Sequence, residues 1–218
     1  MSDANCTCYT IFMPPRRSPR LAAQASNGTS APERDSPVVL MMGVCGSGKS
    51  SVGEKVAENL GLGFQDADDF HPAANKAKMA SGTPLTDEDR WPWLDAMGKQ
   101  AAQCARQPMG SVLACSALKR VYRARLKSYS PSLIVVFLDV PAPVLRARIA
   151  ARKHHFMPAS LIDSQLATLE TPTTKEGFNI LVVVPPSLAS DFEGTVAFIC
   201  EQVKRGAGRG PSRTRSLA

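Results

Sequence analysis

The sequence predicts an α/β fold of three layers, in which helices cover both faces of a five-stranded parallel sheet. Two observations support this prediction. Short apolar runs alternate with segments of helical periodicity, and apolar residues make up 44% of the 218 residues, enough to build a buried core. Parallel strands need helical crossovers, and these cover both faces of a sheet. A ligand is then expected beyond the carboxyl ends of the strands.

The individual elements follow from local signals. Gly61 comes directly after the helical pattern of residues 54–60 and predicts the end of that helix. Thr86 and Asp89 have capping-box spacing, which predicts a helix start before residues 91–106. The apolar runs expected to form strands are residues 37–42, 63–67, 111–115, 133–140 and 179–184.

The two ends of the chain differ from its centre. Residues 1–36 and 206–218 are biased in composition and lack apolar periodicity, so we expect disordered ends around one folded domain, residues 37–205. The formal net charge is +7, and residues 204–218 contribute five cationic side chains without an acid. We interpret the basic charge as a property of solvated tails and expect no nucleic-acid partner, although binding of nucleic acid by the basic tail stays open.

Cysteine spacing and hydropathy exclude several classes of protein. The six cysteines show no CxxC pair and no histidine at metal-ligand spacing, so we expect neither a zinc site nor a disulfide framework. A reducing compartment, the cytoplasm, is the simpler interpretation. No stretch approaches the roughly 18–20 apolar residues that cross a bilayer, and no membrane association is expected. Arg16, Arg17 and Arg20 leave organelle targeting by the N-terminal extension open.

One motif carries a specific chemical prediction. Between an apolar strand and a helical pattern the chain reads GVCGSGKS, which satisfies the phosphate-loop (P-loop) pattern GxxxxGK[ST]. Its glycines let backbone N–H groups turn inward, and the following helix points its positive end at the phosphates of ATP. Lys49 is expected to reach the β- and γ-phosphates, and the Ser50 hydroxyl to bind Mg²⁺. The predicted nucleotide-binding residues of the loop are Gly43, Val44, Cys45, Gly46, Ser47, Gly48, Lys49, Ser50 and Ser51.

Acidic residues follow the second predicted strand. Asp66 and Asp68 share one direction if the chain is still extended there, so that both carboxylates would face the triphosphate. We assign Asp66 to the metal, which a carboxylate can hold through water, and Asp68 to the acceptor hydroxyl, which it would orient and deprotonate. Two alternatives stay open: the acids could form a helix start, and Asp69 could exchange roles with Asp68.

Six motifs give the chain a family resemblance. They are GVCGSGKSSV (43–52), DADDFHP (66–72), NKAKMASGTPLTDEDRWPWL (75–94), CSALKRVYR (115–123), ARKHHF (151–156) and SQLATLE (164–170). Over most of residues 38–205 the chain resembles the gluconokinase family. The resemblance implies an adenylate-kinase-like fold with a lid, a homodimer, and transfer of the γ-phosphoryl group of ATP to the 6-hydroxyl of D-gluconate. His154 and Leu166 depart from the family, which more often has Gly and Phe there.

A sugar acid needs cations for its carboxylate and polar groups for its hydroxyls, because an unpaired buried charge is costly. We favour Lys78, Lys119 and Arg123, although each could instead be a solvated surface cation. Trp91 and Trp93 are expected to be packing residues. The candidate substrate-binding residues, all on the resembling motifs, are Asp68, His71, Lys78, Arg90, Ser116, Lys119 and Arg123.

Basic residues are dense near residue 150. Arg146, Arg148, Arg152 and Lys153 would repel one another on a helix unless an anion answers them, and the triphosphate is the expected anion. The resemblance places Arg152 in a mobile lid over ATP, so Arg148 and Arg152 are assigned to the nucleotide and Lys49, Asp68 and Arg152 to catalysis. Residues 185–187 are expected to line the adenine pocket. Two functional alternatives remain: another small-molecule kinase such as shikimate kinase, whose Gly-Gly-Gly run this chain lacks, and a non-catalytic ATP-binding module.

Overall fold

The computed structural model describes residues 36–81, 83, 85–151 and 159–207. The expected disordered ends fall almost entirely outside these residues. Arg152, Lys153 and His154 lie outside them as well, so their assigned roles stay predictions.

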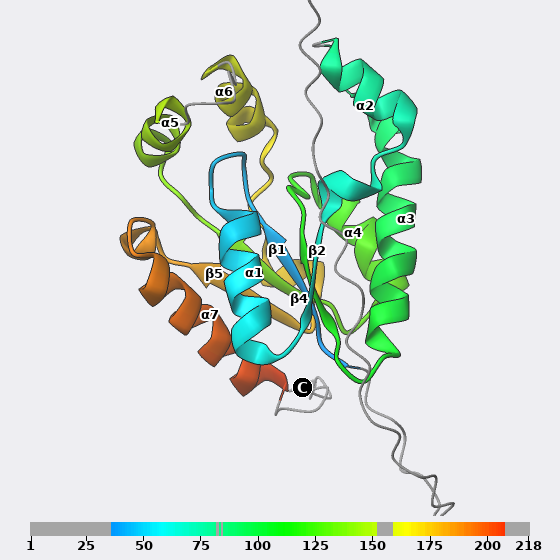
Figure 1. The fold of residues 1–218 in the computed structure, drawn as a ribbon, viewed down its shortest axis with the longest axis vertical. Helices are drawn as coiled ribbons and strands as arrows, with labels where there is room; N and C mark the ends of the chain where they lie inside the picture. The colour runs from blue at the N-terminus through cyan, green and yellow to red at the C-terminus, as the bar shows by residue number, and fades with distance from the viewer. Residues whose placement is uncertain (1–35, 82, 84, 152–158, 208–218) are drawn as a thin grey trace, which may run out of the picture. The chain divides into compact units, whose positions relative to one another are not determined.

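The core of the fold is a parallel sheet with β1 (Val38–Met42) at its centre. The five strands lie in the order β2-β3-β1-β4-β5 (Figure 1). In the register of the sheet, Val39 stands opposite Val112 on one side and Ile134 on the other. The other strands are β2 (Gly63–Asp66), β3 (Ser111–Ala114), β4 (Ile134–Leu138) and β5 (Ile180–Val184). The predicted parallel sheet is confirmed, and each strand lies within the apolar run that predicted it.

Helices connect the strands in the described part of the chain. The α-helices are α1 (Lys49–Leu60), α2 (Ala73–Ala80), α3 (Asp87–Ala105), α4 (Arg120–Tyr129), α5 (Ala142–Ala150), α6 (Ala159–Thr168) and α7 (Phe192–Ala207). Short 3₁₀ helices form at η1 (Ala67–Phe70), η2 (Thr174–Glu176) and η3 (Pro186–Leu188). Two predicted boundaries are confirmed: Gly61 ends α1 with a φ of 66°, and Thr86 and Asp89 form a reciprocal capping box at the start of α3.

The alternation of side chains along β1 produces the three layers. Val38, Leu40 and Met42 are fully buried in one apolar cluster with α3 and α4. Val39 and Met41 point the other way, into a second cluster with α1 and α7. Figure 1 shows these helix pairs on opposite faces of the sheet. Every β1 side chain is therefore buried, as expected for a central parallel strand.

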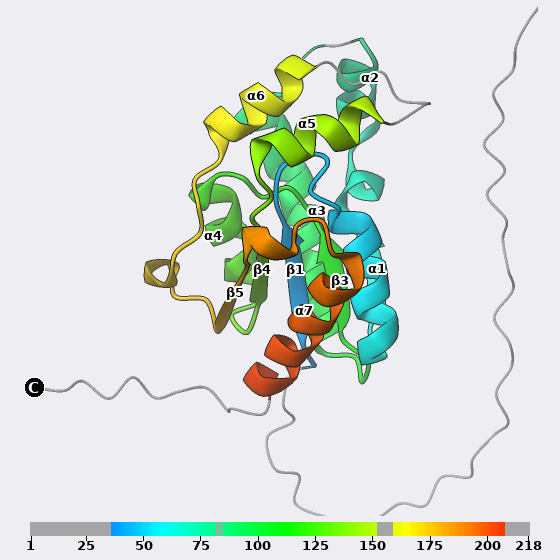
Figure 2. The same cartoon turned by 90° about the vertical axis from the view of Figure 1, so that its left-hand side faces the viewer.

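A group of helices extends beyond the carboxyl ends of the strands. Figures 1 and 2 show α2, α5 and α6 at this end of the fold, together with the loop between β1 and α1. A third apolar cluster joins α5 and α6 to this loop and includes Val44, Leu145, Ile149 and Ile162. No helix among the described residues is long and apolar enough to span a membrane.

Candidate active site

The P-loop connects β1 directly to α1. Gly46 and Gly48 adopt φ angles of 80° and 96°, which side chains rarely tolerate. Gly48 is also the N-cap of α1, and it supplies no side-chain oxygen to the first N–H groups of the helix. These N–H groups and the positive end of the helix dipole therefore suit an anion that approaches from outside the loop.

The side chain of Lys49 contacts the backbone of the P-loop. Its Nζ donates to the carbonyl oxygen of Val44 at 3.0 Å, so the ammonium group is held against the loop. Loss of water around Lys49 lowers its pKa, and the nearby Cys45, Cys115, Asp68 and Asp66 partly offset this effect. A phosphate group beside Lys49 would stabilise the charged form further.

The side chains of Ser50 and Asp66 meet at the start of α1. The Ser50 hydroxyl donates to one carboxylate oxygen of Asp66 at 2.6 Å, and the other oxygen accepts the backbone N–H of Asp68 at 3.0 Å. A hydroxyl oxygen beside a carboxylate is a set of hard donors that fits Mg²⁺. Among the described residues, no group of three or more His, Cys, Asp or Glu could hold a metal ion, so phosphates and water would have to complete its shell.

Asp68 reaches this region by a route that differs from the expectation. The chain is not extended after Asp66, because η1 begins at Ala67 and Asp66 caps it. The turn nevertheless keeps Asp68 in electrostatic contact with Asp66 and Lys49. Loss of water is the main cause that raises the pKa of Asp68, and the charge of Asp66 adds to it, while His71 and Lys49 oppose the shift. The structure therefore brings Lys49, Ser50, Asp66 and Asp68 together.

His71 and Trp93 pack against each other beside η1. Their rings stack at 4.3 Å with an angle of 10°, and the Trp93 indole donates to the carbonyl oxygen of Ala67 at 2.7 Å. Burial lowers the pKa of His71, which favours the neutral ring, and its buried Nδ1 has no hydrogen-bond partner among the described residues. The packing role expected for Trp93 is confirmed by its 7% exposure.

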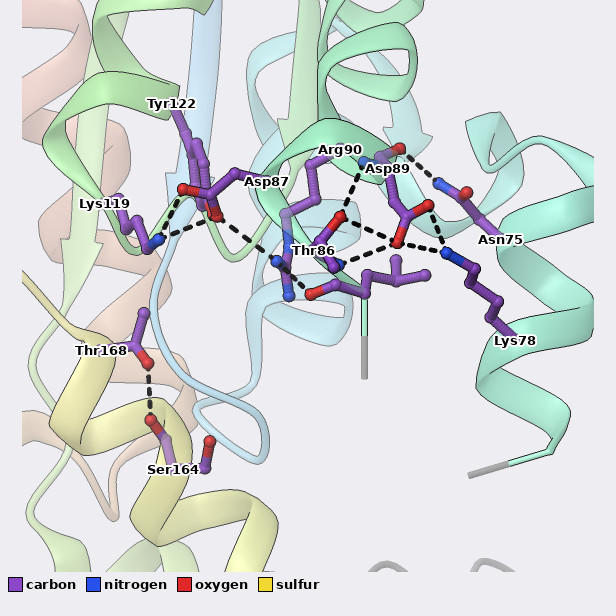
Figure 3. Close-up of polar contacts among 11 residues, drawn as sticks. Asn75, Lys78, Thr86, Asp87, Asp89, Arg90, Lys119, Tyr122, Ser164 and Thr168 are labelled. Carbon is purple, nitrogen blue, oxygen red and sulfur yellow. Dashed lines mark hydrogen bonds and ion pairs between the residues drawn. The ribbon is translucent and has the colours of Figure 1, made fainter. Parts of the chain in front are cut away.

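Two of the predicted substrate cations share one carboxylate at the start of α3 (Figure 3). Lys119 donates to both oxygens of Asp87, at 2.8 and 2.7 Å, and the Tyr122 hydroxyl donates to the same carboxylate. Arg90 lies 3.7 Å from Asp87 and also donates to the carbonyl oxygen of Leu85. The bonds from Lys119 and then Tyr122 hold the pKa of Asp87 below its usual value. Asp87 therefore stays ionised and fixes the position of Lys119.

A third predicted cation, Lys78, has a different partner. It pairs with Asp89 at 2.7 Å, the same residue that closes the capping box with Thr86. Asn75 of α2 donates to the Asp89 carbonyl oxygen at 2.8 Å. Figure 3 shows both contacts running from α2 to the first turn of α3. Lys78 and Asn75 thus fasten α2 to the helix that carries Asp87 and Arg90.

The prediction for Arg123 does not fit its position. Its side chain is fully buried and pairs with Glu176, which is only 6% exposed. Nη1 of Arg123 donates to the carbonyl oxygens of Ala117 and Leu118, at 3.0 and 2.9 Å. Ala117 has a φ of 42°, in the left-handed region. Arg123 therefore supports the loop between Ser116 and Lys119 from inside the protein, and it offers no exposed donor to a substrate.

Arg148 lies beside the P-loop, and its assignment to the nucleotide stays a prediction. Its Nη1 donates to the carbonyl oxygens of Gly46 and Ser47, at 3.2 and 3.0 Å, and its Nη2 donates to Ala189. Beside it is a cavity of about 430 Å³, lined by P-loop residues and by Val140, Arg148, Pro185 and Phe192 among others. The expectation that the segment after the last strand lines the adenine pocket is consistent with Pro185, although Ser187 is not among the lining residues.

Arg146 was expected to need the triphosphate as its anion, but it pairs with an acid of the protein. Its anion is Asp163 of α6, to which both terminal nitrogens donate. The expected triphosphate is therefore not needed to neutralise Arg146, and this ion pair instead joins α5 to α6. No local pattern predicts this pairing, because the two residues are 17 positions apart on different helices.

Sequence reasoning also missed three residues of this region. Asp87 and Tyr122 organise Lys119, and Gln165 of α6 accepts the backbone N–H of Cys45 at 2.7 Å. Each lies within a motif that carried the family resemblance. A tyrosine and a glutamine carry no charge, however, so composition alone does not mark them as functional.

Comparisons with known proteins identify the family of the chain. A profile of the AAA domain family (AAA_33) matches residues 38–172. The thermoresistant gluconokinase of Escherichia coli (strain K12) is 40% identical over 177 residues, which cover 81% of this chain and 99% of that protein. The chain belongs to the gluconokinase family.

Solved structures support the same family at the level of the fold. A gluconokinase from Sinorhizobium meliloti 1021 is 41% identical, with a TM-score of 0.61, and covers 78% of this chain and 95% of its own. An unliganded sugar kinase from Janibacter sp. HTCC2649 is 41% identical, with a TM-score of 0.68, and covers 77% and 94%. The gluconokinase resemblance predicted from the motifs, the kinase class and the P-loop fold are thereby confirmed, and nucleotide use follows from them.

Proposed function

We propose that the chain transfers the γ-phosphoryl group of MgATP to the 6-hydroxyl of D-gluconate and forms 6-phosphogluconate. The observation that carries this proposal is the grouping of Lys49, Ser50, Asp66 and Asp68 at the end of the P-loop. It joins a phosphate-binding loop to a carboxylate that can orient an alcohol and accept its proton. Catalysis of phosphoryl transfer consists mainly of positioning and charge stabilisation, and these residues supply both.

Asp68 is proposed to orient the 6-hydroxyl and accept its proton. Its pKa is raised by loss of water, so its carboxylate is a stronger base than that of an ordinary aspartate. Lys49 is proposed to neutralise charge on the β- and γ-phosphates. Mg²⁺ would supply positive charge that stabilises the phosphates during transfer. Ser50 would hold it directly and Asp66 through water.

The sugar acid is proposed to lie against the start of α3. Arg90 and Lys119 face a single acid, Asp87, so this group carries one positive charge in excess. One excess charge suits the single carboxylate of gluconate. Ser116 and His71 are proposed to contact hydroxyl groups, while Lys78 and Arg123 act through the elements that they fasten.

The nucleoside is proposed to occupy the cavity beside Arg148. Arg148 then supports the P-loop from the nucleoside side, and Arg152, which lies outside the described residues, is proposed to contact the phosphates. We also propose a homodimer in the cytoplasm. Sedimentation of the purified protein would test the first point, and imaging of the tagged full chain would test the second.

A product-specific assay tests the reaction. Purified full chain is incubated with MgATP and, in separate reactions, D-gluconate, shikimate and nucleoside monophosphates. We expect ADP release with gluconate alone, and a phosphorus NMR signal of a phosphomonoester whose carbon couplings identify C6. Faster turnover of shikimate would establish the alternative kinase. Nucleotide binding without any transfer would establish the non-catalytic module.

A truncated variant tests whether the basic C-terminal tail binds nucleic acid. A variant that ends at Ala207 keeps the described residues of α7 and removes Arg209, Arg213 and Arg215. We expect unchanged gluconate phosphorylation. A salt-sensitive binding of nucleic acid that the truncation abolishes would instead support a second role of the tail.

A further inference from the structure

One contact links α6 to the P-loop across 120 positions of sequence. The backbone N–H of Cys45 donates to Oε1 of Gln165 at 2.7 Å, at the short end of the range for N–H···O bonds. The donor also fixes the orientation of the glutamine amide, because a backbone N–H must meet the oxygen and not the nitrogen. Gln165 therefore accepts the hydrogen bond of one N–H group that was predicted to bind phosphate.

The position of Gln165 does not depend on this bond alone. Ile162 and Leu166, its neighbours on α6, belong to the apolar cluster that includes Val44 of the P-loop and Ile149 of α5. On the exposed side of the helix, Asp163 pairs with Arg146. Packing and an ion pair thus hold α6 beside the loop, and the side chain of Gln165 is presented to it.

The cavity indicates which phosphate this N–H would meet. The P-loop residues that line the cavity are Gly46, Ser47, Gly48 and Ser51. Cys45 does not line the cavity, so a nucleotide whose base lies there would direct its terminal phosphate toward the Cys45 N–H. ADP lacks the γ-phosphate, so ATP alone would need this N–H.

We propose that Gln165 competes with the γ-phosphate for the Cys45 N–H and thereby weakens binding of ATP relative to ADP. Gln165 is a positioning residue in this proposal: the terminal phosphate displaces its amide oxygen, and the amide returns to Cys45 once the phosphoryl group has left. The contact couples the placement of α6 to the state of the nucleotide. This inference rests on the proposed use of MgATP.

The test compares two nucleotides in the absence of gluconate. Calorimetry measures the Kd of the full chain for ADP and for the β,γ-imido analogue of ATP, both with Mg²⁺. Gln165→Leu removes the competing oxygen at similar size, and we expect the analogue to bind about five-fold more tightly, the contribution of one ordinary hydrogen bond, with ADP unchanged. Gln165→Glu places a negative charge beside the γ-phosphate, and we expect the analogue to lose at least about ten-fold more affinity than ADP.

Thr168→Ala is the matched control. Thr168 lies on the same helix and donates within it, to the Ser164 carbonyl oxygen at 2.8 Å (Figure 3), so neither Kd should change. An equal change of both nucleotides in Gln165→Leu would mean that the contact only fastens α6, and would overturn the proposal. A selective loss of analogue affinity would overturn it too, because Gln165 would then assist the γ-phosphate. If the unmodified protein binds neither nucleotide, the proposed function itself fails.

Discussion

Arg123 and Glu176 form a bidentate ion pair in the interior of the protein. Nε and Nη2 of Arg123 donate to the two carboxylate oxygens of Glu176 at 2.8 and 2.7 Å. The remaining nitrogen holds the carbonyl oxygens of Ala117 and Leu118, and the backbone N–H of Glu170 also donates to Leu118 at 3.0 Å. The loop that presents Ser116 and Lys119 is therefore anchored from two directions.

Replacement of Arg123 should destabilise the protein strongly. Arg123→Met leaves the Glu176 carboxylate buried without its cation, and we expect the free energy of unfolding to fall by about 3–5 kcal/mol. Arg125→Met is the control on the same helix, since Arg125 pairs with Asp95 at the surface and should contribute only about 0–1 kcal/mol. Urea denaturation measures both. Equal losses in the two variants would contradict a stabilising role of the buried Arg123–Glu176 ion pair.

Asp68→Asn should separate turnover from nucleotide binding. The amide cannot accept the proton of the 6-hydroxyl, so we expect kcat to fall by roughly 100-fold or more, with the Kd for MgATP nearly unchanged. Asp69→Asn is the control, because it tests whether Asp69 exchanges roles with Asp68. A large loss in the Asp69 variant and a small one in the Asp68 variant would transfer the role to Asp69.

The same carboxylate predicts a change of stability with pH. The folded state raises the pKa of Asp68, so it favours the protonated form relative to the unfolded chain. The stability that this preference contributes is present below the unfolded pKa and is lost as pH rises through the folded pKa. At pH 7, Asp68→Asn should therefore be slightly more stable than the unmodified protein, and this advantage should vanish in acid. Thermal denaturation from pH 4 to pH 7 measures the difference, and an Asn variant that is less stable at pH 7 would contradict it.

The fold and the P-loop were predictable because their signals are local. The buried strand β1 and the eight-residue P-loop are each specified by consecutive residues, and the structure contains both where the pattern predicted them. The capping box of α3 depends on Thr86 and Asp89, three positions apart, and was confirmed for the same reason. The extended chain expected from Asp66 to Asp68 is absent for a local reason as well, because Asp66 caps η1 and turns the chain before Asp68.

The partners of the charged residues could not be predicted in the same way. Arg123 and a surface arginine look identical in sequence, and the burial of Arg123 depends on Glu176, 53 positions later. Arg146 pairs with Asp163 on α6, and Gln165 accepts a hydrogen bond from Cys45 of the P-loop, 120 positions away. These contacts arise from the packing of helices beyond the carboxyl end of the sheet, which periodicity does not specify.

Lys119 provides the sharpest test of the substrate site. Its ammonium pairs with Asp87 and lies 5.5 Å from the centre of the Tyr122 ring, so its position is fixed in the protein without a ligand. Lys119→Met removes one charge-assisted bond, and we expect the KM for gluconate to rise roughly 10- to 100-fold while the KM for ATP stays unchanged. Tyr122→Phe should raise the gluconate KM less, because Asp87 keeps its bond to Lys119. Lys127→Met, on the same helix but bonded to the Glu176 carbonyl oxygen, is the matched control and should change neither KM. If Lys119→Met raises the KM for ATP by the same factor as that for gluconate, this cation does not select the sugar acid, and the excess charge at the start of α3 serves the nucleotide instead.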